Sequence, residues 1–308
     1  VFEVGMDKKG EIDYLSKIIK PDIGVITNIS YAHAKNFNNI KQISLAKSEI
    51  INNIKDGGFV VLNADDNFFN FHKTLALKKK LKIISFGIDN KKSNIKLLKI
   101  IKISKKFKLR INVNNVKMNF YVSSDNENDI RNLLAAIAVI NLVVDIKKLK
   151  NNIFFGYRPP SGRGDISKIN IFKKNIFLID ESYNSNPLSL NSAIKNFDKI
   201  KVKQQKKYLI LGDMLELGKH SKKLHLSTSK TINQSSINKI NVMGRHVMHT
   251  FKNIKKEKKG EVINKPSQII DLIRGKLNNN DYLMIKGSNS TGLFKFVKNI
   301  KNRKFNAL

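Results

Sequence analysis

The chain has 308 residues, 41% of them hydrophobic, and no cysteine, so it can bury the cores of about two domains but cannot use disulfides or a thiolate, which fits a reducing cytoplasm. No apolar run approaches the roughly 20 residues of a membrane-spanning helix, and no signal segment opens the sequence, so membrane insertion and secretion are not expected. Its 58 basic and 24 acidic residues give a net charge of +34, but the lysines are scattered, which favours compositional drift over a nucleic-acid surface.

The first half of the chain alternates short β-rich segments with amphipathic ones. Residues 1–5 read as a strand already in progress, which suggests that an N-terminal part is missing. Alternation of this kind predicts βαβ units and a mostly parallel sheet. The expected strands are 23–29, 59–62 and 81–86, and the expected helices between them are 11–20 and 41–55.

From residue 95 the pattern changes. Alternating side chains over 95–122, with Asn114-Asn115 as a turn, predict an antiparallel meander, and helices are expected at 129–143 and 146–155. Two prolines and two glycines in Tyr157–Gly164 then mark a linker or ligand loop. A second doubly wound α/β unit follows, with strands expected at 176–180, 207–212, 238–243 and 281–287.

Lys47 interrupts the apolar face of the helix expected from residue 41. It lies four residues after Ile43 and three before Ile50, in the stripe that should face the core. A buried ammonium is costly unless it is paired or neutral. Lys47 therefore either extends its ammonium to the solvent-exposed edge of the helix or pairs with Glu11 or Glu49, or else it is a functional lysine whose pKa burial lowers.

Polar side chains follow the first complete strand, at a strand end where open α/β sheets gather ligands. Asn28 is a candidate hydrogen-bonding residue and His33 a candidate metal or phosphate contact. Glu3 is unusual because a carboxylate within an apolar strand is seldom left unpaired. Glu3, His33 and Lys47 could bind one cation together, although local structure explains each of them as well when it is taken alone.

The segment from Gly212 to His220 looks like a phosphate-binding P-loop but lacks its chemistry. Five residues rather than four separate Gly212 from Gly218, and His220 stands where a serine or threonine would bind Mg²⁺. Asp213 and Glu216 would also repel phosphate. The segment is not a P-loop, and the sequence contains no other.

Several segments, in order along the chain, resemble the Mur ligase family. In the first half they are residues 1–6 with 10–12, 27–29 with His33, 46–50 and 63–66. In the second half, residues 180–187 are similar to the signature D-D-S-Y-N-A-N-P, 211–218 to L-G-D-M-x-E-L-G and 286–288 to K-G-S. The signatures at 180–187 and 211–218 favour the branch that adds D-alanyl-D-alanine over branches that add other amino acids.

The resemblance implies an ATP-dependent ligase that joins D-alanyl-D-alanine to UDP-N-acetylmuramoyl-tripeptide through an acyl phosphate, during peptidoglycan precursor synthesis. It implies a partial central ATPase-type domain with a mostly parallel sheet over 1–158 and a Rossmann-like C-terminal α/β domain over 159–308. It also implies a cytoplasmic monomer whose partners are small-molecule substrates.

The resemblance assigns roles to the unusual residues. Glu3 and His33 would hold Mg²⁺, and Lys47 would be carbamylated beside it, which requires the neutral amine that burial favours. Lys286 and Ser288 would approach the incoming dipeptide or the phosphate. The residues expected to bind ATP are Asn28, Asn132, Arg163, Asp180, Glu181, Tyr183, Asn184 and Asn186, with Arg163 at phosphate, Asp180 or Glu181 at ribose, and Tyr183 and Asn184 near adenine.

The sequence also departs from the family. It contains neither the N-terminal domain nor the P-loop, so this stretch alone is not expected to hold ATP productively. Of the motif G-x-H-N-x-x-N only Asn132 remains, and Asn289 stands where arginine is common. The alternatives are a sibling Mur or folylpolyglutamate-type ligase, and a basic nucleic-acid-binding α/β protein that has lost its chemistry.

Overall fold

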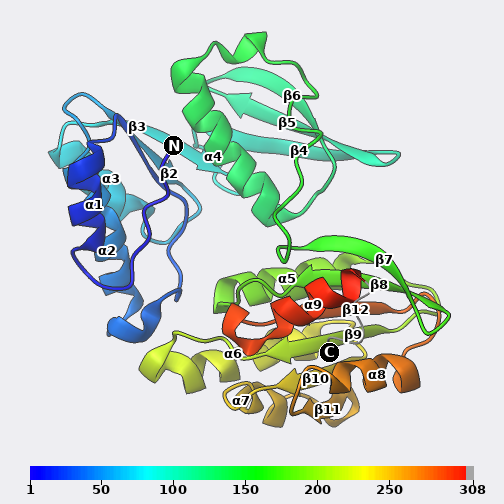
Figure 1. The fold of residues 1–308 in the computed structure, drawn as a ribbon. Coiled ribbons are helices and arrows are strands. Elements are labelled where there is room, and N and C mark those ends of the chain that lie inside the picture. The colour runs from blue at the N-terminus through cyan, green and yellow to red at the C-terminus, as the bar shows by residue number, and fades with distance from the viewer. Residues whose placement is uncertain (303–308) are drawn as a thin grey trace. The chain divides into compact units, whose positions relative to one another are not determined.

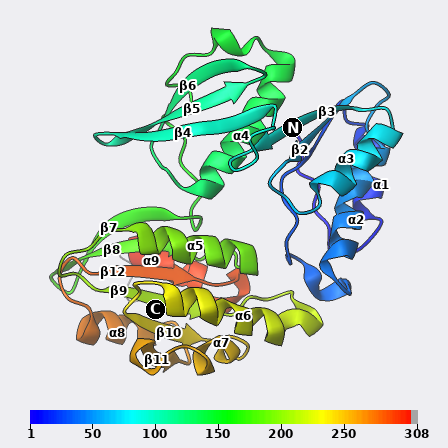
Figure 2. The ribbon, with the colours of Figure 1, turned by 180° about the vertical axis from the view of Figure 1, so that it is seen from behind.

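The chain folds into two compact units, Val1–Arg158 and Pro159–Leu308, and the computed structural model describes residues 1–302. Each unit contains one mostly parallel six-stranded sheet with helices on its faces (Figures 1 and 2). The break falls at Pro159-Pro160, where the missing amide hydrogens prevent a helix from continuing. The α/β class predicted from the sequence is confirmed.

The strands of unit 1 follow one another in chain order across the sheet. β1 to β4 run parallel, and β4 to β6 form an antiparallel meander. The meander is confirmed, and its Asn114-Asn115 turn has positive φ at both residues, as this kind of two-residue hairpin requires. The strands are β1 (Ile23–Ile26), β2 (Phe59–Asn63), β3 (Lys82–Gly87), β4 (Ile95–Ile103), β5 (Lys106–Val113) and β6 (Val116–Val122).

Helices cover both faces of this sheet. α4 packs against β2 to β6 in an apolar core that contains Val61, Phe86 and Phe120. Val60 and Leu62 alternate with Val61 and are also buried, on the face where α2 and α3 pack, with α1 against α2. The helices are α1 (Glu11–Ile19), α2 (Ile40–Asn52), α3 (Phe69–Lys78) and α4 (Glu127–Val143).

The sheet of unit 2 has the order β11-β10-β9-β12-β8-β7, and only the β7–β8 pair is antiparallel. α8 and α9 pack on one face in a continuous apolar core. α9 lies in front of the sheet in Figure 1, and α5 and α6 lie in front of it in Figure 2. The elements are β7 (Asp165–Ile171), β8 (Lys174–Glu181), α5 (Pro187–Lys199), β9 (Lys207–Gly212), α6 (Ser221–Gln234), β10 (Lys239–Met243), α7 (Met248–Lys252), β11 (Lys259–Ile263), α8 (Gln268–Lys276), β12 (Tyr282–Lys286) and α9 (Leu293–Lys301).

Two predicted elements are wrong. Residues 1–5 form no strand, because the segment pairs with no described strand and its Val1 and Phe2 side chains are exposed, leaving little burial to offset the cost of ordering it. The helix expected at 146–155 is a single 3₁₀ turn, Ile146–Lys148, followed by further turns. Asn151 there accepts a hydrogen bond from Tyr121 N on β6, which holds the segment to the sheet edge.

Two edge strands, β7 and β11, were not predicted. Each pairs on one side only, and exposed polar or charged side chains weaken the alternating apolar pattern that marks a strand. β1 ends at Ile26 rather than Ile29, because the backbone of the next residues bonds to side chains instead of a neighbouring strand. Within residues 1–302 no helix has the length and hydropathy needed to cross a bilayer.

Candidate active site

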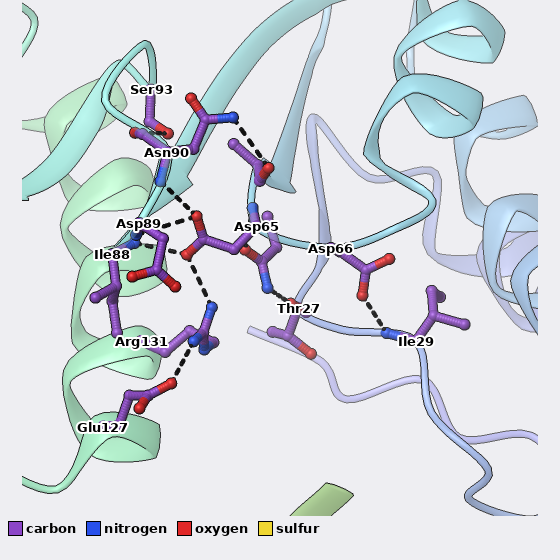
Figure 3. Close-up of polar contacts among 12 residues, drawn as sticks. Thr27, Ile29, Asp65, Asp66, Ile88, Asp89, Asn90, Ser93, Glu127 and Arg131 are labelled. Carbon is purple, nitrogen blue, oxygen red and sulfur yellow. Dashed lines mark hydrogen bonds and ion pairs between the residues drawn. The ribbon is translucent and has the colours of Figure 1, made fainter.

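Two side chains at the carboxyl end of β2, one from its last residue and one from the turn that follows, hold the loop after β1. Asn63 Nδ2 donates to Thr27 O over 2.9 Å. Asp66 Oδ2 accepts from Ile29 N over 2.8 Å, as Figure 3 shows. Asn28 lies between these two anchors. The carboxyl ends of two adjacent parallel strands are therefore joined at the edge where α/β sheets bind ligands.

Lys47, on α2, reaches this loop. Its side chain is partly buried, and Nζ donates to Asn28 O over 3.1 Å. Burial lowers the pKa of Lys47 below its ordinary value, and the nearby negative charge of Asp66 opposes that shift. The interaction that binds Asn28 is thus made by its backbone carbonyl, not by the side chain singled out from the sequence.

Neither carboxylate suggested as a partner for Lys47 pairs with it. Glu49 accepts from Gly10 N and Asp13 N at the start of α1, and Glu11 accepts from backbone amides just before that helix. Carboxylates are favoured there because the amides of a helix N-terminus are otherwise unsatisfied. The ion pairs of the described residues do not include Lys47, so the pairing alternative is wrong.

His33 lines an open depression of about 850 Å³ formed by residues 5–11, Tyr14, Leu15 and His33. Its backbone is left-handed, with φ of 53°, and Nδ1 lies 3.3 Å from Asp7 Oδ1. Glu3 is exposed and lies in a segment without secondary structure. The structure therefore brings His33 to Asp7, and the convergence of Glu3, His33 and Lys47 stays a prediction.

The fit of a divalent cation depends on the state of Lys47. The described part of the chain contains no group of three or more histidine, aspartate or glutamate side chains that could hold a metal ion. An ammonium cannot coordinate a cation, whereas Mg²⁺ takes oxygen ligands. With Lys47 unmodified, these residues do not fit Mg²⁺.

His72 is a buried residue of this region that the sequence did not single out. It is 2% exposed, and Nε2 lies 3.0 Å from Ser44 Oγ, which links α3 to α2. Burial lowers the pKa of His72 below its ordinary value, with backbone hydrogen bonding to Ser44 opposing the shift. A neutral ring is thus favoured within hydrogen-bonding distance of the helix that carries Lys47.

In unit 2, Lys286 ends β12 as a fully buried lysine. Its Nζ lies 3.3 Å from Glu181 Oε2 and donates to Asn184 O over 3.0 Å. Burial lowers the pKa of Lys286, and the Glu181 carboxylate opposes that shift. Lys286, Glu181 and Asn184, all expected at the site, therefore form one hydrogen-bonded group at the carboxyl ends of β8 and β12.

Asp180 lies in a separate internal network. It is 1% exposed, Oδ1 accepts from Ser182, and Oδ2 accepts from Lys301 Nζ over 2.7 Å. Lys301 also pairs with Asp165, so it joins α9 to β7 and β8. Both oxygens of Asp180 are engaged within the protein, which leaves Glu181 as the more accessible of the two carboxylates considered for ribose.

Arg163 and Tyr183 form a surface platform. The Arg163 guanidinium lies 4.9 Å from the centre of the Tyr183 ring, and the Phe294 ring meets that ring edge-on at 5.5 Å. Gly162 permits this packing, because its φ is +83° and a Cβ there would lie 2.7 Å from the Tyr183 Cβ. Tyr183 stays 39% exposed, so an aromatic face beside a cation is open to a planar ligand.

The segment that resembled a P-loop uses its amides internally. Met214 N donates to His225 Nε2 over 3.0 Å, and Leu215 N donates to Ser288 Oγ over 2.9 Å. Asp213 accepts from Arg245 N and Val247 N, at the start of the segment that leads into α7. These amides have protein acceptors, in agreement with the conclusion that this is not a P-loop.

Of two further residues expected to bind nucleotide, one has a structural role and the other is exposed on a helix. Asn186 is the N-cap of α5 and forms a capping box with Ser189. Asn132 is exposed on α4. The Asn-x-x-Ser spacing before a helix could have identified the cap, whereas the partners Lys301 and His225 lie too far along the chain for any local pattern to indicate them.

Comparisons with known proteins match both units. Residues 1–140 match the Mur ligase middle domain, and residues 169–289 match the family described as Mur ligase, glutamate ligase domain. The UDP-N-acetylmuramoyl-tripeptide–D-alanyl-D-alanine ligase of Rickettsia prowazekii is 27% identical over 96% of this chain and 65% of its own length. Its namesake from Buchnera aphidicola subsp. Acyrthosiphon pisum is 32% identical over 97% of this chain and 64% of its own length.

Solved structures share the fold. MurF from Acinetobacter baumannii superposes with a TM-score of 0.83 at 23% identity, covering 98% of this chain and 64% of its own. MurF ligase from Thermotoga maritima, in complex with ADP, gives 0.81 at 19% identity, covering 99% and 67%. The chain spans just under two thirds of the length of the two curated relatives. Because the two domain matches follow one another and together cover most of its residues, the chain belongs to the Mur ligase family.

Proposed function

We propose that this chain is the catalytic and C-terminal part of a cytoplasmic ligase that uses ATP to add D-alanyl-D-alanine to UDP-N-acetylmuramoyl-tripeptide. The observation that carries the proposal is similarity over 96% and 97% of the chain to curated ligases of that name. The segments at 180–187 and 211–218 support this branch, since in unit 2 they bond to Lys286 and Ser288, the residues proposed to approach the dipeptide.

The reaction proposed is acyl transfer through a mixed anhydride. The peptide carboxylate attacks the γ-phosphorus of ATP, which releases ADP, and the dipeptide amine then displaces inorganic phosphate from the acyl phosphate and loses a proton. Charge accumulates where carboxylate and phosphate meet, so cations at that point favour the reaction. Mg²⁺ would supply such charge.

Lys47 is proposed to become an anion through carbamylation. Its neutral amine adds to CO₂ and loses one proton, which leaves a carbamate. Burial favours the neutral amine although the charge of Asp66 opposes it, and Nζ donates to the Asn28 carbonyl rather than to a carboxylate. The carbamate would supply the oxygen ligand that Glu3 and His33 need to hold Mg²⁺.

The nucleotide is proposed to meet unit 2 at the Arg163–Tyr183 platform. An exposed aromatic face suits adenine, and the guanidinium suits a phosphate oxygen. Glu181 and Asn184 lie beside this platform in sequence and could meet the ribose and the base. Asp180 and Asn186 have less support as ligands, because their side chains are engaged in protein contacts.

The proposal is tested by a ligation assay on the protein expressed with its complete reading frame. UDP-N-acetylmuramoyl-tripeptide, D-alanyl-D-alanine and ATP are supplied, phosphate release is followed, and Lys47→Ala is the comparison. We expect product that needs both substrates and falls about a hundred- to a thousandfold in the variant, the scale for loss of a group that acts on developing charge. Activity with a single amino acid instead of the dipeptide would favour a sibling ligase, and no product with any amine would contradict the proposal.

A further inference from the structure

Two adjacent carboxylates after β2 serve different parts of unit 1. Asp65 accepts from Ile88 N over 2.6 Å and Asn90 N over 2.7 Å, and pairs with Arg131 over 2.9 Å. Asp66 accepts from Ile29 N on one oxygen. Figure 3 shows the two side chains directed away from each other, Asp65 toward α4 and Asp66 toward the loop after β1.

Asp66 is anchored at both oxygens. Oδ1 accepts from Phe68 N over 2.8 Å, which fixes the carboxylate at the start of α3, while Oδ2 holds Ile29 N. Amide hydrogen bonds to an ionised carboxylate are stronger than those to neutral groups. The carboxylate is therefore a rigid link between the β2 turn and the loop after β1.

Asn63 provides a second, uncharged link to the same loop. Its amide donates to Thr27 O, and its carbonyl accepts from Asp65 N over 3.0 Å. Asn63 is 5% exposed, so water does not readily replace these bonds. With Thr27 O and Ile29 N both held, the two peptide groups that flank the Asn28 Cα are restricted in orientation, and the second of them contains the Asn28 carbonyl.

That restricted residue is Asn28, whose carbonyl oxygen accepts from Lys47 Nζ. A lysine has four rotatable side-chain bonds, and fixing them requires a defined acceptor. We propose that Asp66, together with Asn63, is a positioning residue that orients the Lys47 amine through the Asn28 carbonyl. The reactive role of that amine rests on the function proposed above, whereas the positioning does not.

The first test compares Asp66→Asn with Asp65→Asn, a matched control on the neighbouring residue. An asparagine at 66 accepts through one oxygen only, so either Ile29 N or Phe68 N loses its partner. We expect hydrogen exchange of residues 27–31 to rise about tenfold, the scale of one lost hydrogen bond to a charged group, with faster acetylation of Lys47 by acetic anhydride. Asp65→Asn should speed exchange at residues 88–90 and leave Lys47 acetylation unchanged.

Asn63→Ala separates positioning from charge. It releases Thr27 O and Asp65 N without altering any charge near Lys47, so faster acetylation in this variant cannot come from a change of charge. It also keeps the test open if Asp66→Asn fails to fold. Unchanged Lys47 acetylation in Asn63→Ala, despite faster exchange at residues 27–31, would overturn the proposal.

A second readout uses activity of the protein from its complete reading frame. If the Lys47 carbamate forms less readily in Asp66→Asn, kcat should fall with little change in KM, and added bicarbonate should restore it. Asp65→Asn should show no bicarbonate rescue. The role of Asp66 would be overturned if bicarbonate restored the kcat of Asp66→Asn and Asp65→Asn alike. It would also be overturned if bicarbonate restored neither variant while the wild-type protein depends on it. If bicarbonate changes the kcat of neither the wild type nor the variants, the carbamate proposal fails. The acetylation rates of Lys47 then still test whether Asp66 positions its amine.

Discussion

The lysines at the carboxyl ends of the two sheets differ in what faces them. Lys286 in unit 2 is fully buried and has the Glu181 carboxylate 3.3 Å away. Lys47 in unit 1 is partly buried and has the Asn28 carbonyl instead. Burial lowers the pKa of both, but only Lys286 has a close carboxylate that opposes the shift with both charge and a hydrogen bond.

This difference separates two uses of a buried lysine. An ammonium paired with a carboxylate is held in its charged form and can bind an anion or fix a loop. A lysine that contacts only a carbonyl gives up less electrostatic stabilisation when it becomes neutral, and the neutral amine is the form that reacts with CO₂. Lys286 ends strand β12, whereas Lys47 lies on helix α2 and reaches the loop after β1, and the proposed roles are binding for the first and modification for the second.

The largest expected effect follows from replacing each lysine by methionine. Lys286→Met leaves the Glu181 carboxylate, whose side chain is 16% exposed, without its partner, so we expect unit 2 to lose about 3 kcal/mol of stability, the lower end of the range for breaking a buried pair. Lys47→Met removes an ammonium that has no carboxylate partner, so unit 1 should change by less than about 1 kcal/mol while ligation is lost. Hydrogen exchange in urea, read separately on peptides of each unit, gives both values. Equal losses of stability in the two units would contradict the proposed difference between Lys286 and Lys47.

A smaller effect is expected from Arg131→Met in unit 1. Its guanidinium is the one cation that pairs with Asp65 in the described structure, and the Asp65 side chain is only 7% exposed. Loss of a hydrogen bond to a charged, buried group should cost about 1.5–3 kcal/mol. The same exchange measurement should show the loss confined to unit 1, with residues 88–90 affected most. Glu127→Gln is the control, because its carboxylate is half exposed and its pair with Arg131 should contribute little.

The site was predictable where a local pattern violates a rule. Lys47 in an apolar stripe is such a pattern, and its hydrogen bond to the Asn28 carbonyl gives the physical reason. The Asn114-Asn115 turn was predictable for the opposite reason, because it follows the hairpin rule. Pairs of residues that lie far apart in the sequence produce no local pattern of this kind. Arg131 pairs with Asp65 across 66 residues and Lys301 pairs with Asp180 across 121, so these pairs could not be predicted from the neighbouring residues in the sequence.

Asn186 is expected to be a nucleotide ligand, but in the structure its side chain has a structural role. As N-cap of α5 it accepts from Ser189 N over 2.9 Å. Asn186→Ala should cost about 1 kcal/mol of unit 2 stability through the lost cap, and Asn186→Asp should restore it. If Asn186 also binds nucleotide, KM for ATP should rise in both variants. If KM for ATP rises only in Asn186→Ala, the variant that loses stability, Asn186 acts only as the helix cap.

The smallest expected effect is a dependence of stability on pH in both units. Burial lowers the pKa of His72 in unit 1 and of His225 in unit 2. Each ring therefore binds a proton more readily in the unfolded chain, so its contribution to stability is complete above the unfolded pKa of about 6.5 and falls as the pH drops toward the folded value. Urea midpoints at pH 7.5 and 5.5 measure this. His225→Gln should reduce the dependence in unit 2 alone, and stability that rises on acidification would contradict the assignment.

The contrast between the two lysines is tested most directly by ¹³C NMR of the protein from its complete reading frame, equilibrated with ¹³C-bicarbonate and Mg²⁺. We predict one carbamate resonance that disappears in Lys47→Met and persists in Lys286→Met. A resonance that survives Lys47→Met, or none in the wild type while ligation proceeds, would contradict the proposal that the lysine without a carboxylate partner is the one that reacts.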